Sequence, residues 1–251
     1  MTAEIAPFDV TGKVVLITGA NRGIGSALVD TFLERGAKKV YGAVRDLASL
    51  TVSDERIVPL YLDLSIPSSI ADAAKKSQDV DIVINNAGIL LQAQPLDVDA
   101  LSNLKQQMQV NVYGLIELAQ QYAPILKVNG GGVLVQLNSL ASFRSGFPQV
   151  STYSASKAAS YSITQSLKHQ LAEQNTRVVS VHPGPIATDM IAAAGEEFIK
   201  MAEHPKNVAL EVIQAIEDGS FHVFPDAKAK NLAVIVGPYT KEIIEGGKMY
   251  G

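Results

Sequence analysis

Apolar residues occur along this chain in short uninterrupted runs, and between them apolar positions recur at helical spacing. The run at 13–18, Lys-Val-Val-Leu-Ile-Thr, has no polar alternation, which is typical of a parallel strand covered on both faces. Similar runs predict further strands, with a plausible edge strand last, at 40–44, 58–64, 81–84, 133–137, 177–181 and 221–225.

Helical spacing is clearest in the segments 97–123 and 154–172. Because helices alternate with strands and turns follow the strands, the pattern predicts an α/β fold: a doubly wound parallel sheet of Rossmann type, with about seven strands and helices on both faces. A chain of 251 residues is expected to form a single domain. We expect an extension at 1–11, a substrate lid at 188–206 and a tail of unassigned structure at 226–251.

Composition and charge exclude several classes of protein. Hydrophobic residues make up 47% of the chain and charged residues 18%, unlike a disordered or fibrous chain. The net charge is -4 and no run is rich in Lys or Arg, so no nucleic-acid partner is expected. The absence of Cys and the scatter of four His predict neither disulfides nor a metal site. No apolar run approaches the ~20 residues of a membrane span, and the N-terminus lacks a signal-peptide pattern, so we expect a cytoplasmic protein without a membrane partner.

The first strand runs into a Gly-rich turn at 19–25, Gly-Ala-Asn-Arg-Gly-Ile-Gly, after which a helical pattern begins. Small residues let the backbone approach a pyrophosphate, and the amino end of the helix offers unpaired N–H groups to it. The pattern favours a dinucleotide cradle over a plain strand-to-helix turn, which remains the alternative. The cradle would consist of Gly19, Asn21, Arg22, Gly23, Ile24 and Gly25.

The end of the second strand indicates which dinucleotide binds. In this fold it reaches the adenosine ribose, where an acid would accept from the 2′-hydroxyl and an Arg would hold a 2′-phosphate. Val44 occupies the position of the acid, Arg45 follows it, and Arg22 adds a second guanidinium. The two cations favour NADP(H); the alternatives are that both are surface arginines and that Asp46 serves as the acid.

Polar residues also follow the third and fourth strands. Asp63, which precedes Leu64, could accept a hydrogen bond from the adenine amino group or cap the next helix. The run at 85–88, Asn-Asn-Ala-Gly, can tie neighbouring strands together or form a bare turn. The residues that would let a cofactor approach here are Asn86, Ala87 and Gly88.

Tyr153 and Lys157 are four residues apart in helical sequence, so their side chains share one helix face. A neighbouring cation favours the phenolate and predicts a lowered tyrosine pKa, although the pair alone is equally compatible with a solvated helix face. Asn111 lies among apolar positions and must be hydrogen-bonded, either as a structural link or within a polar relay. His182 ends a strand before Pro183, and we expect a structural role for it.

Together these motifs resemble those of the short-chain dehydrogenase/reductase family, in one order over residues of roughly 12–190. The residues that carry the resemblance are Thr18–Gly25, Asn85–Gly88, Asn111, Ser139, Tyr153–Lys157 and Pro183 with Gly184.

The resemblance implies a role for each member of the set. Tyr153 would be the general acid/base, and Ser139 would polarise the substrate carbonyl. Lys157 would hold the ribose and lower the tyrosine pKa, while Asn111 would anchor a water-linked proton relay. Further cofactor contacts are implied for Pro183, Gly184, Ile186 and Thr188, the last of which would reach the nicotinamide carboxamide.

The chain departs from the family pattern at two places. Phe224-Pro225-Asp226 stands where many members have an Asp-Gly-Gly signature at a tetramer contact, so we expect a homodimer through the helices at 97–123 and 154–172. The lid contains Ala-Ala-Ala-Gly at 192–195, which favours an open pocket. Its apolar walls would be Leu90, Leu91, Leu140, Phe143, Phe147, Met190 and Ile191, with ordinary core packing as the alternative for each.

These residues predict the NADPH-dependent reduction of an uncharged, hydrophobic ketone or aldehyde to an alcohol. The cofactor carries the hydride, and Tyr153 supplies the proton. One alternative is the NAD(P)-dependent oxidation of a secondary alcohol or hydroxysteroid. The other is a nucleotide-sensing protein without turnover, and an intact proton-relay set argues against it.

Overall fold

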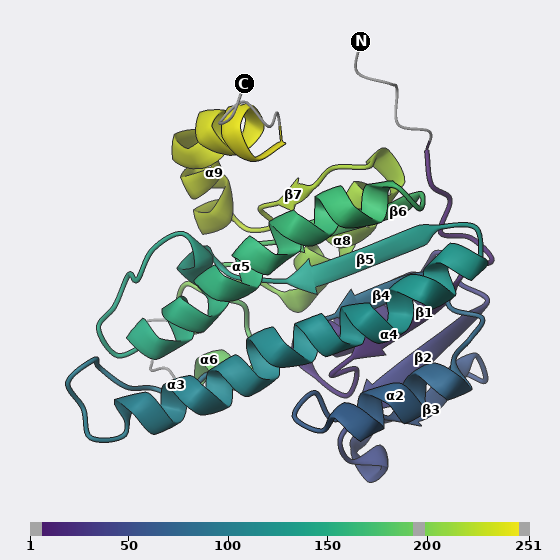
Figure 1. Ribbon diagram of the computed structural model, residues 1–251, viewed down its shortest axis with the longest axis horizontal. Helices are drawn as coiled ribbons and strands as arrows, with labels where there is room; N and C mark the ends of the chain where they lie inside the picture. The colour runs from purple at the N-terminus through teal and green to yellow at the C-terminus, as the bar shows by residue number, and fades with distance from the viewer. Residues whose placement is uncertain (1–6, 193–198, 246–251) are drawn as a thin grey trace.

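The computed structural model describes residues 7–192 and 199–245, which form one domain around a single parallel sheet (Figure 1). The strand order is β3-β2-β1-β4-β5-β6-β7, so the chain starts in the middle of the sheet and winds outward in both directions. The predicted doubly wound fold is therefore confirmed. The strands are β1 (Val14–Thr18), β2 (Lys39–Val44), β3 (Ile57–Tyr61), β4 (Ile82–Asn85), β5 (Gly132–Leu137), β6 (Thr176–Val181) and β7 (His222–Val223).

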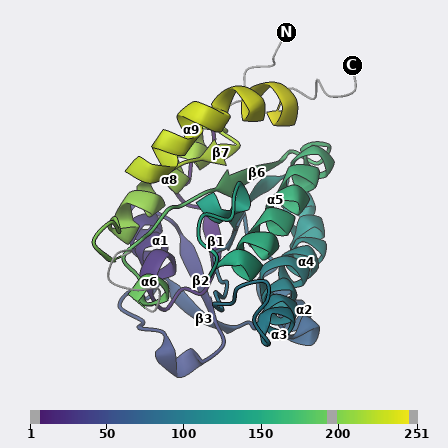
Figure 2. The same ribbon diagram turned by 90° about the vertical axis from the view of Figure 1, so that its left-hand side faces the viewer.

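Helices cover both faces of the sheet (Figures 1 and 2). One face carries α2 (Pro67–Lys76), α4 (Gly114–Val128) and α5 (Ser151–Ala172), and the other carries α1 (Gly23–Glu34) and α8 (Pro205–Asp218). The remaining helical segments are α3 (Ala100–Met108), α6 (Asp189–Ala192), α9 (Ala227–Tyr239), the 3-10 turns η1 (Leu47–Ser49) and η3 (Leu140–Ser142), and the π-helical turns η2 (Gln109–Tyr113) and η4 (Thr240–Glu245). Among the described residues, no helix is long and apolar enough to cross a membrane.

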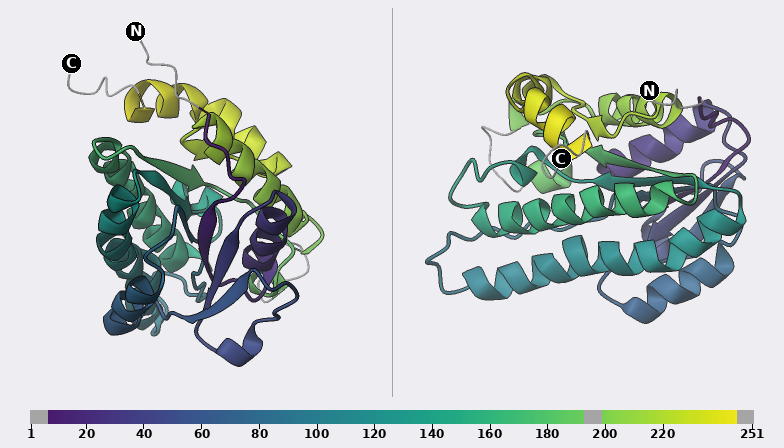
Figure 3. Two further views of the ribbon diagram at one scale, coloured as in Figure 1. Left: turned by 90° about the vertical axis from the view of Figure 1, so that its right-hand side faces the viewer. Right: turned by 45° about the horizontal axis from the view of Figure 1, so that its top comes forward.

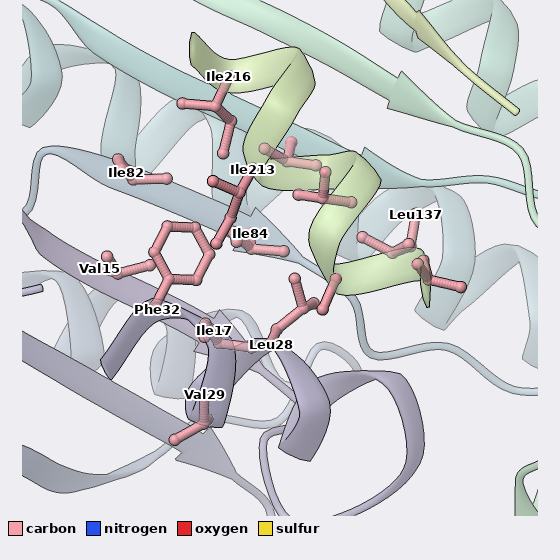
Figure 4. Close-up of a cluster of buried hydrophobic side chains, with 14 of the residues drawn as sticks. Val15, Ile17, Leu28, Val29, Phe32, Ile82, Ile84, Leu137, Ile213 and Ile216 are labelled. Atoms are coloured by element: carbon pink, nitrogen blue, oxygen red, sulfur yellow. The ribbon is translucent and has the colours of Figure 1, made fainter. Parts of the chain in front are cut away.

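Alternate residues of each strand serve the two faces of the sheet, which explains why the strand runs lack polar positions. Val15 and Ile17 of β1 belong to the cluster that packs against α1 and α8, together with Phe32 (Figure 4). Leu16, between them, belongs to the opposite cluster with Tyr122 of α4.

The segment predicted as one helix at 97–123 forms α3, η2 and α4 in succession. In the right-hand view of Figure 3, these three elements form one long, nearly continuous helix beside α5. A π turn inserts one extra residue into the helical ladder and often marks a functional site. Here it contains Asn111.

The tail without a predicted structure forms α9 and η4. Asp226 begins α9: its Oδ1 accepts the backbone N–H of Ala229, and its Oδ2 accepts that of Gly184 at 2.6 Å. The residues at the Asp-Gly-Gly position therefore connect this helix to the loop after β6.

The other end of the tail is held by a chain of three polar side chains. Nδ1 of His222 lies 2.7 Å from Oε1 of Glu245 in η4, and Nε2 lies 2.6 Å from the hydroxyl of Tyr161 in α5. The hydrogen bond with His222 lowers the pKa of Glu245. Segment 227–245 is thus attached to the sheet at both ends.

Candidate active site

A cavity of about 1360 Å³ lies at the carboxyl ends of the strands and spans the switch point between β1 and β4, where this fold binds its ligands. It exceeds the roughly 300–1,000 Å³ typical of small-molecule sites, as a cavity for a dinucleotide and a second molecule should. Its walls contain all but one of the residues that the sequence assigned to the cofactor: Gly19, Asn21, Arg22, Gly23, Ile24, Arg45, Asp63, Leu64, Asn86, Ala87, Gly88, Tyr153, Lys157, Pro183, Gly184, Ile186 and Thr188.

The Gly-rich turn has the backbone of an anion cradle. Gly19 and Gly23 have φ of +67° and +56°, in the left-handed region that favours glycine. Helix α1 begins after Arg22, and no side chain caps its amino end, so its first N–H groups face the cavity without a side-chain acceptor. These groups fit a pyrophosphate, because an anion there satisfies free donors and the helix dipole together.

The one exception is Gly25, which does not line the cavity. A Cβ at this position would lie 2.0 Å from the carbonyl oxygen of Gly19. Gly25 therefore allows α1 to pack directly on the turn. The prediction that Gly25 contacts the cofactor is corrected: its role is to permit close packing between helix and strand.

Replacing Gly25 with Ala should lower the free energy of unfolding by more than about 2 kcal/mol and weaken NADPH binding, because the methyl group forces the turn and the helix apart. Urea unfolding and a fluorescence titration with NADPH measure the two effects. Gly237→Ala in α9 is the matched control, since a Cβ there meets nothing within 4 Å. Wild-type stability and affinity in Gly25→Ala would contradict this packing role.

The adenosine end of the cavity contains Arg45, whose side chain is exposed. Asp46 is engaged in local structure: its Oδ1 accepts the N–H of Ala48 at the start of η1, and this opposes the alternative in which it binds the ribose. Arg22, predicted as a second phosphate ligand, forms an ion pair of 2.8 Å with Asp189. Both side chains of this pair are exposed, so it is weak enough for a phosphate to compete.

Asp63 lies two residues beyond β3 and lines the cavity. Its Oδ1 accepts hydrogen bonds from the backbone N–H and the hydroxyl of Ser65, at 2.8 and 2.7 Å. The N-cap residue of the following helix, α2, is Ile66, and no side chain caps the amino end of this helix. The alternative in which Asp63 caps α2 is therefore wrong.

Two adjacent amides tie the central strands together at the floor of the cavity. The Asn85 amide donates to Oε1 of Gln136 at 2.7 Å, which links β4 to β5. Asn86 donates to the carbonyl oxygen of Thr18 at 2.8 Å, and the hydroxyl of Thr18 accepts the N–H groups of Asn86 and Ala87. The hydrogen bonds between neighbouring strands that were predicted for the Asn-Asn-Ala-Gly run are therefore present.

Ser139 follows β5 and begins η3, where its hydroxyl accepts the N–H of Ala141. Its carbonyl oxygen lies 3.2 Å from Nδ1 of His182, whose Nε2 lies 2.8 Å from the Ser180 hydroxyl. Burial and the neighbouring His222 lower the pKa of His182 to about 3. His182 is therefore a neutral, structural residue that supports the Ser139 loop from behind.

Tyr153 lies in the first turn of α5, buried at the wall of the cavity that Ser139 also lines. Burial raises the pKa of Tyr153 to about 12, and the nearby Ser139 side chain opposes part of this rise. The prediction of a lowered tyrosine pKa is therefore wrong for this structure. Desolvation is the larger effect, and the ammonium of Lys157 lies 5.8 Å from the ring centroid.

Lys157 is buried beneath Tyr153, and its ammonium donates to the carbonyl oxygen of Leu137 at 2.7 Å. Burial lowers the pKa of Lys157 to about 8. The ammonium has three donors, and this contact uses one, so two can serve a ribose hydroxyl or a water.

This shift predicts a pH dependence. The pH dependence of kcat/KM for NADPH reports the pKa values of groups in the free enzyme. This parameter should be constant well below pH 8 and fall at higher pH, because Lys157 then loses the proton that attracts a ribose oxygen. Lys157→Arg should turn over more slowly but lack the decline, because a guanidinium stays charged. The same break in the Lys157→Arg profile would assign the titration to another group.

Asn111 is buried beside Lys157 but does not line the cavity. Its Oδ1 accepts the N–H of Ile89 at 2.9 Å, and its Nδ2 donates to the carbonyl oxygen of Ile89 and the hydroxyl of Ser156, both at 3.0 Å. The side chain is thus a structural link between the loop after β4 and α5. A proton relay through this position would have to use the backbone of the π turn.

The substrate end of the cavity is mostly apolar. Of the predicted walls, those that line it are Leu90, Leu91, Leu140, Phe147, Met190 and Ile191. Phe143 does not, and this prediction is corrected: its ring packs against Tyr161, His182 and Phe224, with centroids 4.8–5.9 Å apart. Residues 193–198 of the predicted lid lie outside the described residues.

Helix α9 supplies a wall that the sequence did not predict. Lys228, Asn231, Leu232 and Ile235 line the cavity from this helix. The signal in the sequence is the apolar spacing at 229–236, which follows an unusual strand end.

Comparison with known proteins agrees with this geometry. The family model described as short chain dehydrogenase matches residues 13–198. The chain belongs to the short-chain dehydrogenase family. It is therefore an oxidoreductase of that family, with the Rossmann-type domain that the fold shows.

Named relatives include two hydroxysteroid dehydrogenases. A 3alpha-hydroxysteroid dehydrogenase from Mediterraneibacter gnavus is 34% identical over 75% of this chain and 79% of its own length. A 7alpha-hydroxysteroid dehydrogenase from Escherichia coli is 32% identical over 77% of this chain and 79% of its own length. A short chain dehydrogenase from Burkholderia cenocepacia, solved in complex with NADP, superimposes with a TM-score of 0.86 at 31% identity and covers 94% of this chain and 97% of that one.

Proposed function

We propose that the protein reduces a hydrophobic ketone or aldehyde to an alcohol with NADPH. The observation that carries this proposal is that Ser139 and Tyr153 line one cavity whose other end is an anion cradle. A carbonyl oxygen placed beside both hydroxyl groups receives one hydrogen bond and one transferable proton where negative charge develops.

The two hydroxyl groups have different roles in the proposed reaction. A bound NADPH supplies the hydride that adds to the carbonyl carbon. Tyr153, protonated at neutral pH because of its raised pKa, donates its proton to the carbonyl oxygen. Ser139 donates a hydrogen bond to the same oxygen, and the ammonium of Lys157 stabilises the phenolate that is left.

The preference for NADPH rests on the adenosine end. Val44 is buried where an acid would bind the 2′-hydroxyl of NAD, and Asp46 is occupied by η1. Arg45 remains as the cation beside the expected 2′-phosphate. That the superimposable Burkholderia protein was solved with NADP supports the same cofactor.

A second candidate is the oxidation of a secondary alcohol or hydroxysteroid. The names of the two relatives favour it, and the same residues catalyse it in reverse. In that direction Tyr153 acts as the base, and its raised pKa predicts that oxidation becomes efficient only at alkaline pH.

We also propose a homodimer through α4 and α5, as expected from the sequence. The helical rod of α3, η2 and α4 exposes Leu101, Tyr113 and Val128. A buried interface would remove these apolar side chains from water.

An assay with a panel of aromatic and alicyclic ketones and the matching secondary alcohols tests the proposal. Purified protein is mixed with each compound and with NADPH or NADH, or with their oxidised forms for the alcohols. The change in absorbance of the reduced nicotinamide is followed at neutral pH for the ketones and at both neutral and alkaline pH for the alcohols. We expect ketone reduction with NADPH to be fastest. Faster alcohol oxidation would favour the second candidate, and no turnover in either direction would favour a nucleotide-sensing protein.

A further inference from the structure

Two cations lie at the substrate end of the cavity. Arg144 follows η3, and Lys228 lies in the first turn of α9. Both residues line the cavity, and both are exposed to solvent. Asn231, one turn after Lys228, lines the same wall.

The strand order separates these cations from the adenosine end. Arg45 and Asp63 follow β2 and β3 on one side of β1, whereas Arg144 and Lys228 follow β5 and β7 on the other side. The pair therefore faces the substrate and not the 2′-phosphate.

The segments that carry the two cations lie side by side. The rings of Phe143 and Phe224 are 5.9 Å apart. Gly184 lies between the two segments, because a Cβ there would be 2.7 Å from Asp226 and 3.2 Å from Leu140.

Among residues 7–192 and 199–245, no carboxylate that lines the cavity lies at this end. The carboxylates that line the cavity are Asp46 and Asp63 at the adenosine end and Asp189, which pairs with Arg22. Within residues 7–192 and 199–245, neither Arg144 nor Lys228 forms a salt bridge, and the ammonium of Lys228 lies against the sulfur of Met201. Within the described part of the chain, this end of the cavity thus combines apolar walls with two cations that pair with no carboxylate.

We propose, on the basis of the proposed reductase activity, that the substrate has an apolar body bearing the carbonyl group and, at its far end, an anionic group that binds Arg144 and Lys228. A planar guanidinium holds a carboxylate or phosphate through two parallel hydrogen bonds, and an ammonium adds a mobile point charge. The expectation of an uncharged substrate did not include α9, and this proposal replaces it.

Matched probes test the proposal: 5-oxo-5-phenylpentanoate and its neutral primary amide. Wild-type protein should show a KM about three- to tenfold lower for the acid, since each exposed ion pair contributes a factor of about 1.5–5. The ratio of KM for the amide to KM for the acid should shrink at high salt. In the Arg144→Gln, Lys228→Gln double variant this ratio should fall to about one. Lys230→Gln, which breaks only the surface pair with Glu211, should keep the wild-type ratio.

Calorimetric titration of both probes into the NADP-loaded protein separates this proposal from the reductase activity. Tighter binding of the acid that depends on Arg144 and Lys228 supports the anion site even without turnover. Equal affinity and equal KM for acid and amide overturn it, whether or not the ketone is reduced. A phosphate ester of similar length distinguishes the two anions, because the cognate one should lose more affinity in the double variant.

Discussion

Replacing Tyr153 with Phe should lower kcat for ketone reduction by a factor of about 10²–10⁴, while the Kd for NADPH changes less than about twofold. The substitution removes one hydroxyl at the cavity wall and leaves the buried ring in place. The proton donor is lost, but the cradle at the Gly-rich turn is untouched. Steady-state rates with a ketone and quenching of protein fluorescence by NADPH measure the two quantities.

Tyr113→Phe is the matched control, because Tyr113 is half exposed on η2 and does not line the cavity. Its kcat should equal that of the wild type. If Tyr153→Phe retained more than a tenth of the wild-type kcat, another group would have to supply the proton.

Replacing Arg45 with Asp should change the ratio of kcat/KM for NADPH to that for NADH by a factor of about 10²–10³ in favour of NADH. A charge-assisted hydrogen bond to the 2′-phosphate contributes about 1.5–3 kcal/mol, and the new carboxylate repels the phosphate while it accepts from a 2′-hydroxyl. Initial rates with each cofactor at a fixed ketone concentration give the ratio.

Arg45→Gln separates the two contributions to this change. This substitution removes the cation without adding an acid, so kcat/KM for NADPH should fall and kcat/KM for NADH should stay unchanged. An unchanged ratio in Arg45→Asp would mean that the 2′-phosphate is bound elsewhere, with Arg22, released from Asp189, as the next candidate.

The fold and the position of the site follow from local patterns, and these are what a sequence displays. Unbroken apolar runs such as 13–18 require burial on both faces, and only a covered parallel sheet provides it. Since all these strands run in one direction, the residues that follow them meet at one edge. The Gly-rich turn, Asn86 and Ser139 were therefore expected near one another, and they line one cavity.

What could not be predicted depends on contacts between distant segments. Gly25 looks like a ligand-binding glycine, but its neighbour is the carbonyl oxygen of Gly19. Phe143 follows the Ser139 loop, and its side chain packs in an aromatic cluster with Phe224, which comes just after β7. The pKa of Tyr153 depends on the depth of burial, which spacing from Lys157 does not reveal. Helix α9 is placed at the cavity by contacts between distant segments, among them the hydrogen bond from the backbone N–H of Gly184 to Asp226.

The most direct test of the central claim is the fate of a labelled hydride. NADPH that carries deuterium at both hydrogen positions of C4 of the nicotinamide ring is incubated with the protein and a reducible aromatic ketone, and the alcohol product is analysed by mass spectrometry and NMR. Direct transfer beside Ser139 and Tyr153 predicts one deuterium on the carbinol carbon of each product molecule and none on the hydroxyl group. An alcohol without deuterium at that carbon, or no alcohol from any ketone tested, would contradict NADPH-dependent carbonyl reduction.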